Sequence, residues 1–203
     1  MLVDAALLGA KDYILALFNS FPIYIALTSI VFFIGSANIA YMFMAISLTL
    51  IVPAVVALLR VAVGAIGFPD WFVKIPATAQ NPSYWLTSTV FIISYLFMNA
   101  YDLYNKEAPE KAPVHKVAAR KSHAVIAMIS ILAIGLLLVG VRIYGAQESI
   151  AGVLLGLGAG IGVSYAIYNF MTSCGGLRIA DMFGIAGRLE YKNNDGTICY
   201  PVK

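Results

Sequence analysis

Long apolar runs separated by short polar segments dominate this chain. A helix needs about 20 mostly apolar residues to cross a bilayer core of roughly 30 Å, and five runs approach or reach that length. These runs occupy residues 22–37, 40–59, 84–104, 123–141 and 149–171. The pattern predicts an all-α polytopic membrane protein, with a bundle of five transmembrane helices within residues 1–171.

The N-terminal segment decides whether there is a sixth span. Residues 3–18 are largely apolar but contain Asp4, Lys11 and Asp12. Charged side chains are costly at the centre of a bilayer. We therefore expect an interfacial helix here, with a sixth inserted helix as the alternative.

Composition agrees with a membrane protein and argues against several other classes. The chain is 61% hydrophobic and 11% charged, whereas soluble domains are about 25% charged. The net charge of +3, without a basic run interleaved with aromatics, argues against a nucleic-acid partner. Cys174 and Cys199 lack metal-ligand spacing. We expect no metal and no cofactor, and either two ordinary thiols or one disulfide that closes the tail.

Basic residues are distributed unevenly between the two predicted sides. With five spans, the side of Arg60 and Arg142 has four of the 13 Lys and Arg residues, and the side of residues 105–122 and the C-terminus has nine. Because Lys and Arg favour the cytoplasmic side, we expect residues 105–122 and the C-terminus to face the cytosol or its equivalent. The sequence does not name the membrane, and either an endomembrane or an internal membrane of a virus particle would suit such a protein.

The C-terminal residues 172–203 form a predicted tail outside the membrane. Within it, residues 188–202 contain two alternating runs around Asn193-Asn194-Asp195-Gly196, which is typical of a β-hairpin. A lone hairpin is only marginally stable in water. We therefore expect the tail to dock on the membrane domain or on a partner protein.

Three polar spots fall at the same end of the predicted helices. Arg60 follows one span, Pro82-Ser83 precedes the next, and Arg142 follows a third. This order resembles the type 2 phosphatidic acid phosphatase superfamily, whose motifs are Lys-x6-Arg-Pro, Pro-Ser-Gly-His and Ser-Arg-x5-His-x3-Asp. The resemblance covers roughly residues 40–171 and implies a lipid-phosphatase-like helical bundle.

The chain departs from the family at the catalytic positions. Tyr84-Trp85 replaces the Gly-His of the second motif, and Glu148 and Gly152 stand where the third motif has histidine and aspartate. The family mechanism needs an imidazole nucleophile and a positioned acid. The resemblance therefore implies a degenerate member without catalytic residues.

Anion binding is the part of the family chemistry that could survive these changes. Arg60, Ser83 and Arg142 could hold a lipid phosphate headgroup by charge-assisted hydrogen bonds. Alternatively, both arginines anchor helix ends at the interface, and Glu148 pairs with Arg142. We predict a non-enzymatic structural or scaffolding protein whose tail docks a partner. The alternatives are headgroup binding or transport, and a divergent lipid phosphatase.

Small residues at a spacing of four recur in the last span. Gly152, Gly156 and Gly160 would let another helix approach closely. We expect the neighbour to be another helix of the same bundle, with self-association of two chains as the alternative.

Overall fold

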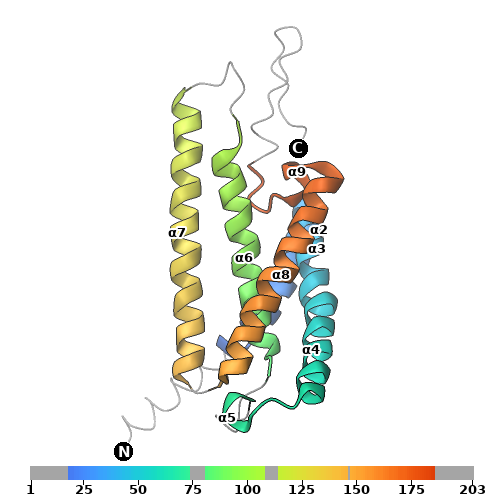
Figure 1. The fold of residues 1–203 in the computed structure, drawn as a ribbon. Coiled ribbons are helices and arrows are strands. Elements are labelled where there is room, and N and C mark those ends of the chain that lie inside the picture. Colours follow the sequence, from blue (N-terminus) through green and yellow to red (C-terminus); the bar gives the residue numbers. More distant parts are fainter. Residues whose placement is uncertain (1–17, 74–80, 108–113, 146, 186–203) are drawn as a thin grey trace, which may run out of the picture.

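The computed structural model describes residues 18–73, 81–107, 114–145 and 147–185, and these residues form helices and connecting turns without strands (Figure 1). The predicted all-α fold is confirmed for this part of the chain. The hairpin expected at 188–202 and nearly all of segment 3–18 lie outside the described residues. The helices are α2 (Phe21–Ser36), α3 (Ile39–Ile46), the π-helical turn η1 (Ser47–Ile51), α4 (Val52–Ile66), α5 (Asp70–Val73), α6 (Tyr84–Asn105), α7 (Val114–Tyr144), α8 (Ile150–Gly175) and α9 (Leu177–Ala180).

Three helical rods are long and apolar enough to cross a membrane, namely Ile39–Ile66, Val114–Tyr144 and Ile150–Gly175. They indicate an integral membrane protein. These rods contain three of the predicted spans, at 40–59, 123–141 and nearly all of 149–171. The other two predicted spans stay predictions, because α2 has only 16 residues and α6 carries several polar side chains.

The first rod is continuous but contains a π-helical turn. Pro53 has no amide hydrogen, and its ring crowds the carbonyl four residues earlier. The backbone widens into η1 just before this proline. The Tyr84 hydroxyl donates to the Leu48 carbonyl within η1 at 2.9 Å. Helix α6 therefore satisfies a backbone group of the interrupted rod.

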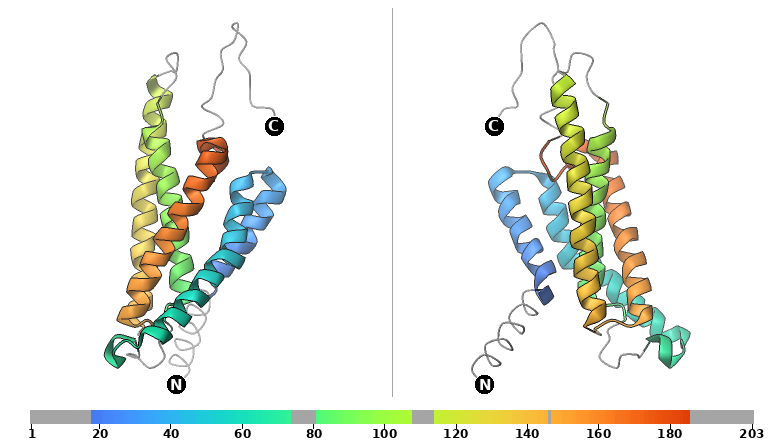
Figure 2. Two further views of the ribbon diagram at one scale, coloured as in Figure 1. Left: turned by 45° about the vertical axis from the view of Figure 1, so that its right-hand side comes forward. Right: turned by 90° about the vertical axis from the view of Figure 1, so that its left-hand side faces the viewer.

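Helix α6 is the centre of the bundle. It contacts α7 on one side and α8 on the other, and α2, α4 and α9 also contact it (Figures 1 and 2). Ser88, Thr89 and Asn99 are buried in this helix. Their polarity is compatible with a membrane protein because they face other helices rather than lipid. By contrast, α7 exposes large apolar side chains such as Ile129 and Leu136, as a lipid-facing helix does.

The glycine stripe of α8 packs against α6. A Cβ atom at Gly160 would lie 2.7 Å from Val90 Cβ and 2.8 Å from the Thr87 carbonyl oxygen. At Gly156 it would lie 3.0 Å from a Leu86 methyl carbon. Packing inside the bundle therefore accounts for these glycines. Self-association through them would require α6 and α8 to separate.

The chain alternates between two ends of the bundle, which we name by one residue at each. At the Arg142 end, α4 and α7 finish and α6 and α8 begin; at the Arg120 end, α6 and α8 finish and α7 begins (Figure 1). Residues 114–122, expected as part of a charged loop, form the first turns of α7. Their lysines, alanines and arginine are good helix formers, which explains the difference.

Candidate functional site

Two helix N-caps lie in the candidate site at the Arg142 end. Ser83 precedes α6 and accepts from the Leu86 amide at 3.1 Å. Ser149 precedes α8 and accepts from the Gly152 amide at 2.9 Å. Serine favours this position because its short side chain satisfies an amide that has no partner within the helix. The polar spots seen in the sequence are thus partly helix starts.

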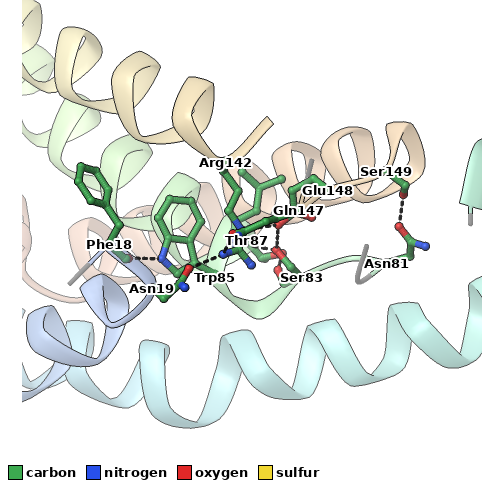
Figure 3. Close-up of polar contacts among 11 residues, drawn as sticks. Phe18, Asn19, Asn81, Ser83, Trp85, Thr87, Arg142, Gln147, Glu148 and Ser149 are labelled. Carbon is green, nitrogen blue, oxygen red and sulfur yellow. Dashed lines mark hydrogen bonds and ion pairs between the residues drawn. The ribbon is translucent and has the colours of Figure 1, made fainter. Parts of the chain in front are cut away.

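Glu148 connects these helix ends (Figure 3). Its side chain is buried, and Ser83 Oγ donates to Glu148 Oε1. Arg142 Nε lies 3.1 Å from the same oxygen, so a hydroxyl and a guanidinium share one carboxylate oxygen. Glu148 Oε2 is buried and has no hydrogen-bond partner. The carboxyl group is therefore only half satisfied.

The remaining contacts of Arg142 are also with the protein. Its Nη1 donates to Asn19 Oδ1 at 2.6 Å and to Gln147 Oε1. The guanidinium carbon lies 5.1 Å from the centre of the Trp85 ring, a cation–π distance. Trp85 Nε1 in turn donates to the Phe18 carbonyl oxygen. Figure 3 shows Arg142 surrounded by these side chains.

Arg60 approaches the same end from α4. Its Nε donates to the Pro82 carbonyl at 3.0 Å, directly beside Ser83. The positive charge of Arg60 also favours the ionised form of the Glu148 carboxyl group. The three residues predicted as an anion site, Arg60, Ser83 and Arg142, therefore come together at this end of the bundle, and Glu148 contacts two of them directly.

Burial dominates the acid–base behaviour of Glu148, which lies between α7 and α8. Loss of water raises the pKa of its carboxyl group, while the hydrogen bonds from Ser83 and Arg142 and the charges of Arg142 and Arg60 oppose the rise without cancelling it. The net effect is a pKa above the usual value of 4.5. This carboxyl group holds a proton more tightly than it would in water.

The geometry leaves little room for a ligand. The cavity beside Arg142, Trp85 and Gln147 has a volume of about 20 Å³, enough for about one water molecule. In the part of the chain that the structure describes, no cluster of His, Cys, Asp and Glu could hold a metal ion. His115 and His123 lie in the first turns of α7. His123 is 19 residues before Arg142, or about 28 Å along a helix. No imidazole of the described residues reaches the cluster.

A second polar cluster, at the Arg120 end, was not predicted. It binds the anchored segment, which we define as residues 177–185 after α8. Tyr95 donates its hydroxyl hydrogen to the Ala180 carbonyl at 2.9 Å, and Asn99 Oδ1 accepts from the Met182 amide at 3.1 Å. Asn38, which caps the start of the first rod, donates to the Asp181 carbonyl at 2.9 Å. Tyr41, within that rod, donates to the Met182 carbonyl at 2.7 Å.

The sequence carried a partial signal for this second cluster. Asn38, Tyr41, Tyr95 and Asn99 are polar residues within or beside apolar runs. Their partners are backbone groups 80 or more residues away in the sequence, so no local sequence pattern links a side chain to its partner. Only the folded bundle shows that these side chains bind the chain itself.

Comparison with protein-family models, curated proteins and solved structures finds no match to this chain. The resemblance to the lipid phosphatases therefore stays a hypothesis based on the order of the motifs, the predicted topology and a few residues.

Proposed function

We propose that this chain is a non-enzymatic integral membrane protein with a degenerate lipid-phosphatase-like bundle, whose role is to present its C-terminal residues 186–203 to a protein partner. The observation that carries the proposal is the anchored segment. Its backbone accepts hydrogen bonds from the side chains of Asn38, Tyr41 and Tyr95, and it donates one to the side chain of Asn99. These bonds hold residues 180–182 against the bundle, which suits a tail that docks a partner.

Burial adds to the strength of this attachment. Tyr95 and Asn99 are 1% and 0% exposed, and Ala180 is 0% exposed. Hydrogen bonds between buried groups are costly to break, because the freed donor or acceptor has no water to replace its partner. The backbone at residues 180–182 is therefore held at one place on the bundle, which favours docking of a partner at a constant position.

The Arg142 end supports a structural role over catalysis. A phosphatase of the resembled kind needs a histidine beside its arginines, and Glu148 stands in that position here. Its Oε1 already accepts hydrogen bonds from Ser83 and Arg142, so this carboxyl group serves as a structural acceptor. Headgroup binding by Arg60, Ser83 and Arg142 is the weaker candidate, because Arg142 already contacts Glu148, Asn19 and Gln147.

Site-specific photo-cross-linking tests the proposal. A photoreactive amino acid is placed at Tyr200, in the tail, in the full chain within the membrane where it is produced. A matched probe is placed at Tyr144, which is 94% exposed at the Arg142 end. We expect a discrete protein adduct from position 200 and none of the same mass from position 144.

The opposite results have equally definite meanings. Equal labelling from both positions, or lipid adducts alone from position 200, would contradict a docking tail. A second assay addresses the enzyme alternative, in which purified protein is incubated with phosphatidic acid vesicles. Phosphate release that is lost in an Arg142→Gln variant would show that the bundle is an active, divergent lipid phosphatase.

A further inference from the structure

A cavity at the Arg120 end lies between α6, α7 and the anchored segment. Its volume is about 200 Å³. It is lined by Ala100, Leu103, Arg120, His123, Ala124, Ala127, Phe183 and Ile185. Apolar cavities of roughly 150 Å³ are large enough to take up an apolar molecule such as benzene. The small alanine side chains on α6 and α7 leave this space open.

Arg120 is an unusual residue to find in such a wall. It is only 6% exposed, although arginine is rarely buried without a partner for its charge. Its Nη2 donates to the Lys106 carbonyl at the end of α6, but its Nε is buried and has no hydrogen-bond partner. Among the described residues, no carboxylate forms an ion pair with Arg120. Within the described residues, the cavity therefore combines an apolar volume with a positive charge that no carboxylate pairs.

A second basic residue lies beside Arg120. Lys121 follows it on α7 and sits 5.5 Å from the centre of the Tyr104 ring. Asp102, on α6, accepts a hydrogen bond from Tyr168 of α8 at 2.8 Å, and Glu107 is exposed. Basic pockets between helices at the edge of a bilayer are places where anionic lipid headgroups bind.

We propose that this cavity is a binding site for an anionic single-chain lipid, whose alkyl chain occupies the space beside Ala124 and Ala127 and whose phosphate or carboxylate contacts Arg120. The headgroup would accept hydrogen bonds from the guanidinium, including its unused Nε, and so supply the missing negative charge. A cavity of about 200 Å³ holds part of one alkyl chain, so two chains would not fit side by side. This site lies at the end of the bundle opposite the Arg142 cluster and does not depend on the docking role of the tail.

Binding is measured by native mass spectrometry of the full chain in a nonionic detergent. The probes are oleoyl lysophosphatidic acid, oleate, oleoyl lysophosphatidylcholine and inorganic phosphate. We expect one molecule of either anionic lipid per chain, bound at least about tenfold more tightly than the zwitterionic lipid with the same alkyl chain. Inorganic phosphate at a hundredfold excess should not displace them, because it lacks the alkyl chain.

Two pairs of variants separate the charge from the volume. Arg120→Gln should abolish the preference for anionic lipids, whereas Lys116→Gln removes one charge at the same end and should keep it. Ala127→Leu fills the cavity and should weaken binding of all three lipids at least about tenfold. Ala133→Leu, on an exposed face of α7, should leave binding unchanged.

Each contrary result overturns a stated part of the proposal. Equal affinity for the anionic and zwitterionic lipids, or an unchanged preference in Arg120→Gln, would mean that Arg120 serves only to cap α6. Displacement by inorganic phosphate would mean that the site binds the anion alone. If Arg120→Gln fails to fold, normal lipid binding by Ala127→Leu would still refute the cavity as the site.

Discussion

Glu148 is the residue in which burial and pairing oppose each other most directly. Its carboxyl group receives hydrogen bonds from Ser83 and Arg142, yet one of its oxygens is buried without a partner. The removal of water costs an ionised carboxylate more than these contacts return, which is why its pKa is raised above 4.5. The pair with Arg142 therefore fixes geometry more than it adds stability.

This balance predicts an unusual dependence of stability on pH. A folded state that binds a proton more tightly than the unfolded chain is most stable while the proton is present. The contribution of Glu148 should be complete below pH 4.5 and should fall as the pH rises through the raised pKa. Glu148→Gln stays neutral at every pH and should lack this loss. The free energy of unfolding of wild type and variant is measured in a nonionic detergent at a series of pH values. The quantity compared is the difference between the two proteins at each pH. A wild type that gains stability over Glu148→Gln with rising pH would show that the ion pair outweighs burial.

Removing the side chain should have a different effect from neutralising it. Glu148→Ala leaves the Ser83 hydroxyl and the Arg142 guanidinium without their shared acceptor. We expect the free energy of unfolding at neutral pH to be about 3 kcal/mol lower than that of Glu148→Gln. Chemical unfolding of both variants under identical conditions gives this difference. Equal stability would mean that Asn19 and Gln147 suffice as acceptors for Arg142.

Sequence reasoning found some residues of this cluster and not others, for identifiable reasons. Arg60, Ser83 and Arg142 stand out as polar residues at the ends of apolar runs, and the pairing of Glu148 with Arg142 was one of the alternatives. Asn19 and Trp85 were missed as partners of Arg142. Their contacts depend on how the start of α2 and the start of α6 lie against the end of α7. The spacing of residues within a single helix does not predict how separate helices pack.

At the scale of helices, the contact between α6 and α8 depends on the absence of a side chain. Gly160→Ala would place a carbon 2.8 Å from the backbone oxygen of Thr87, which cannot move aside as a flexible side chain can. We expect a loss of about 1–3 kcal/mol in unfolding free energy, the usual cost of overpacking a core. The measurement is unfolding in mixed detergent micelles.

Gly158→Ala is the matched control for this substitution. It lies on the same helix, but a Cβ atom there would have nothing within 4 Å. Alanine also favours helix over glycine, so stability should be unchanged or slightly higher. If Gly160→Ala were equally harmless, α6 and α8 would have to be held together by other contacts.

The helices themselves were the most predictable feature, because long apolar runs need little tertiary information. The three rods that could cross a membrane contain three of the predicted spans, with one residue of the last left outside. The role of α6 was not predictable in the same way. Its Ser88, Thr89 and Asn99 read as interruptions of an apolar run, and only its central position explains why they are tolerated. The start of α7 was misplaced because charge alone suggested a loop.

At the scale of the whole molecule, each end of the bundle is fastened by its own polar cluster. At the Arg142 end, buried side chains join the starts and ends of the helices to one another. At the Arg120 end, the bundle binds the segment that leads to the C-terminal residues. The first cluster maintains the shape of the bundle, and the second holds the anchored segment against it.

This division predicts that the anchored segment can be loosened without disturbing the bundle. Asn99→Ala removes the acceptor for the Met182 amide. One hydrogen bond is worth about 1 kcal/mol net, so amide exchange at residues 180–183 should rise roughly fivefold. Asn105→Ala is the control, because this exposed asparagine donates its side-chain hydrogen bond to the Tyr101 carbonyl one turn earlier and not to the anchored segment. Hydrogen–deuterium exchange in nanodiscs should show faster exchange at 180–183 in Asn99→Ala alone, with α8 unchanged. Faster exchange throughout α8 would instead mean that the segment is part of the core that holds the bundle together, and a separable exit for the tail would be refuted.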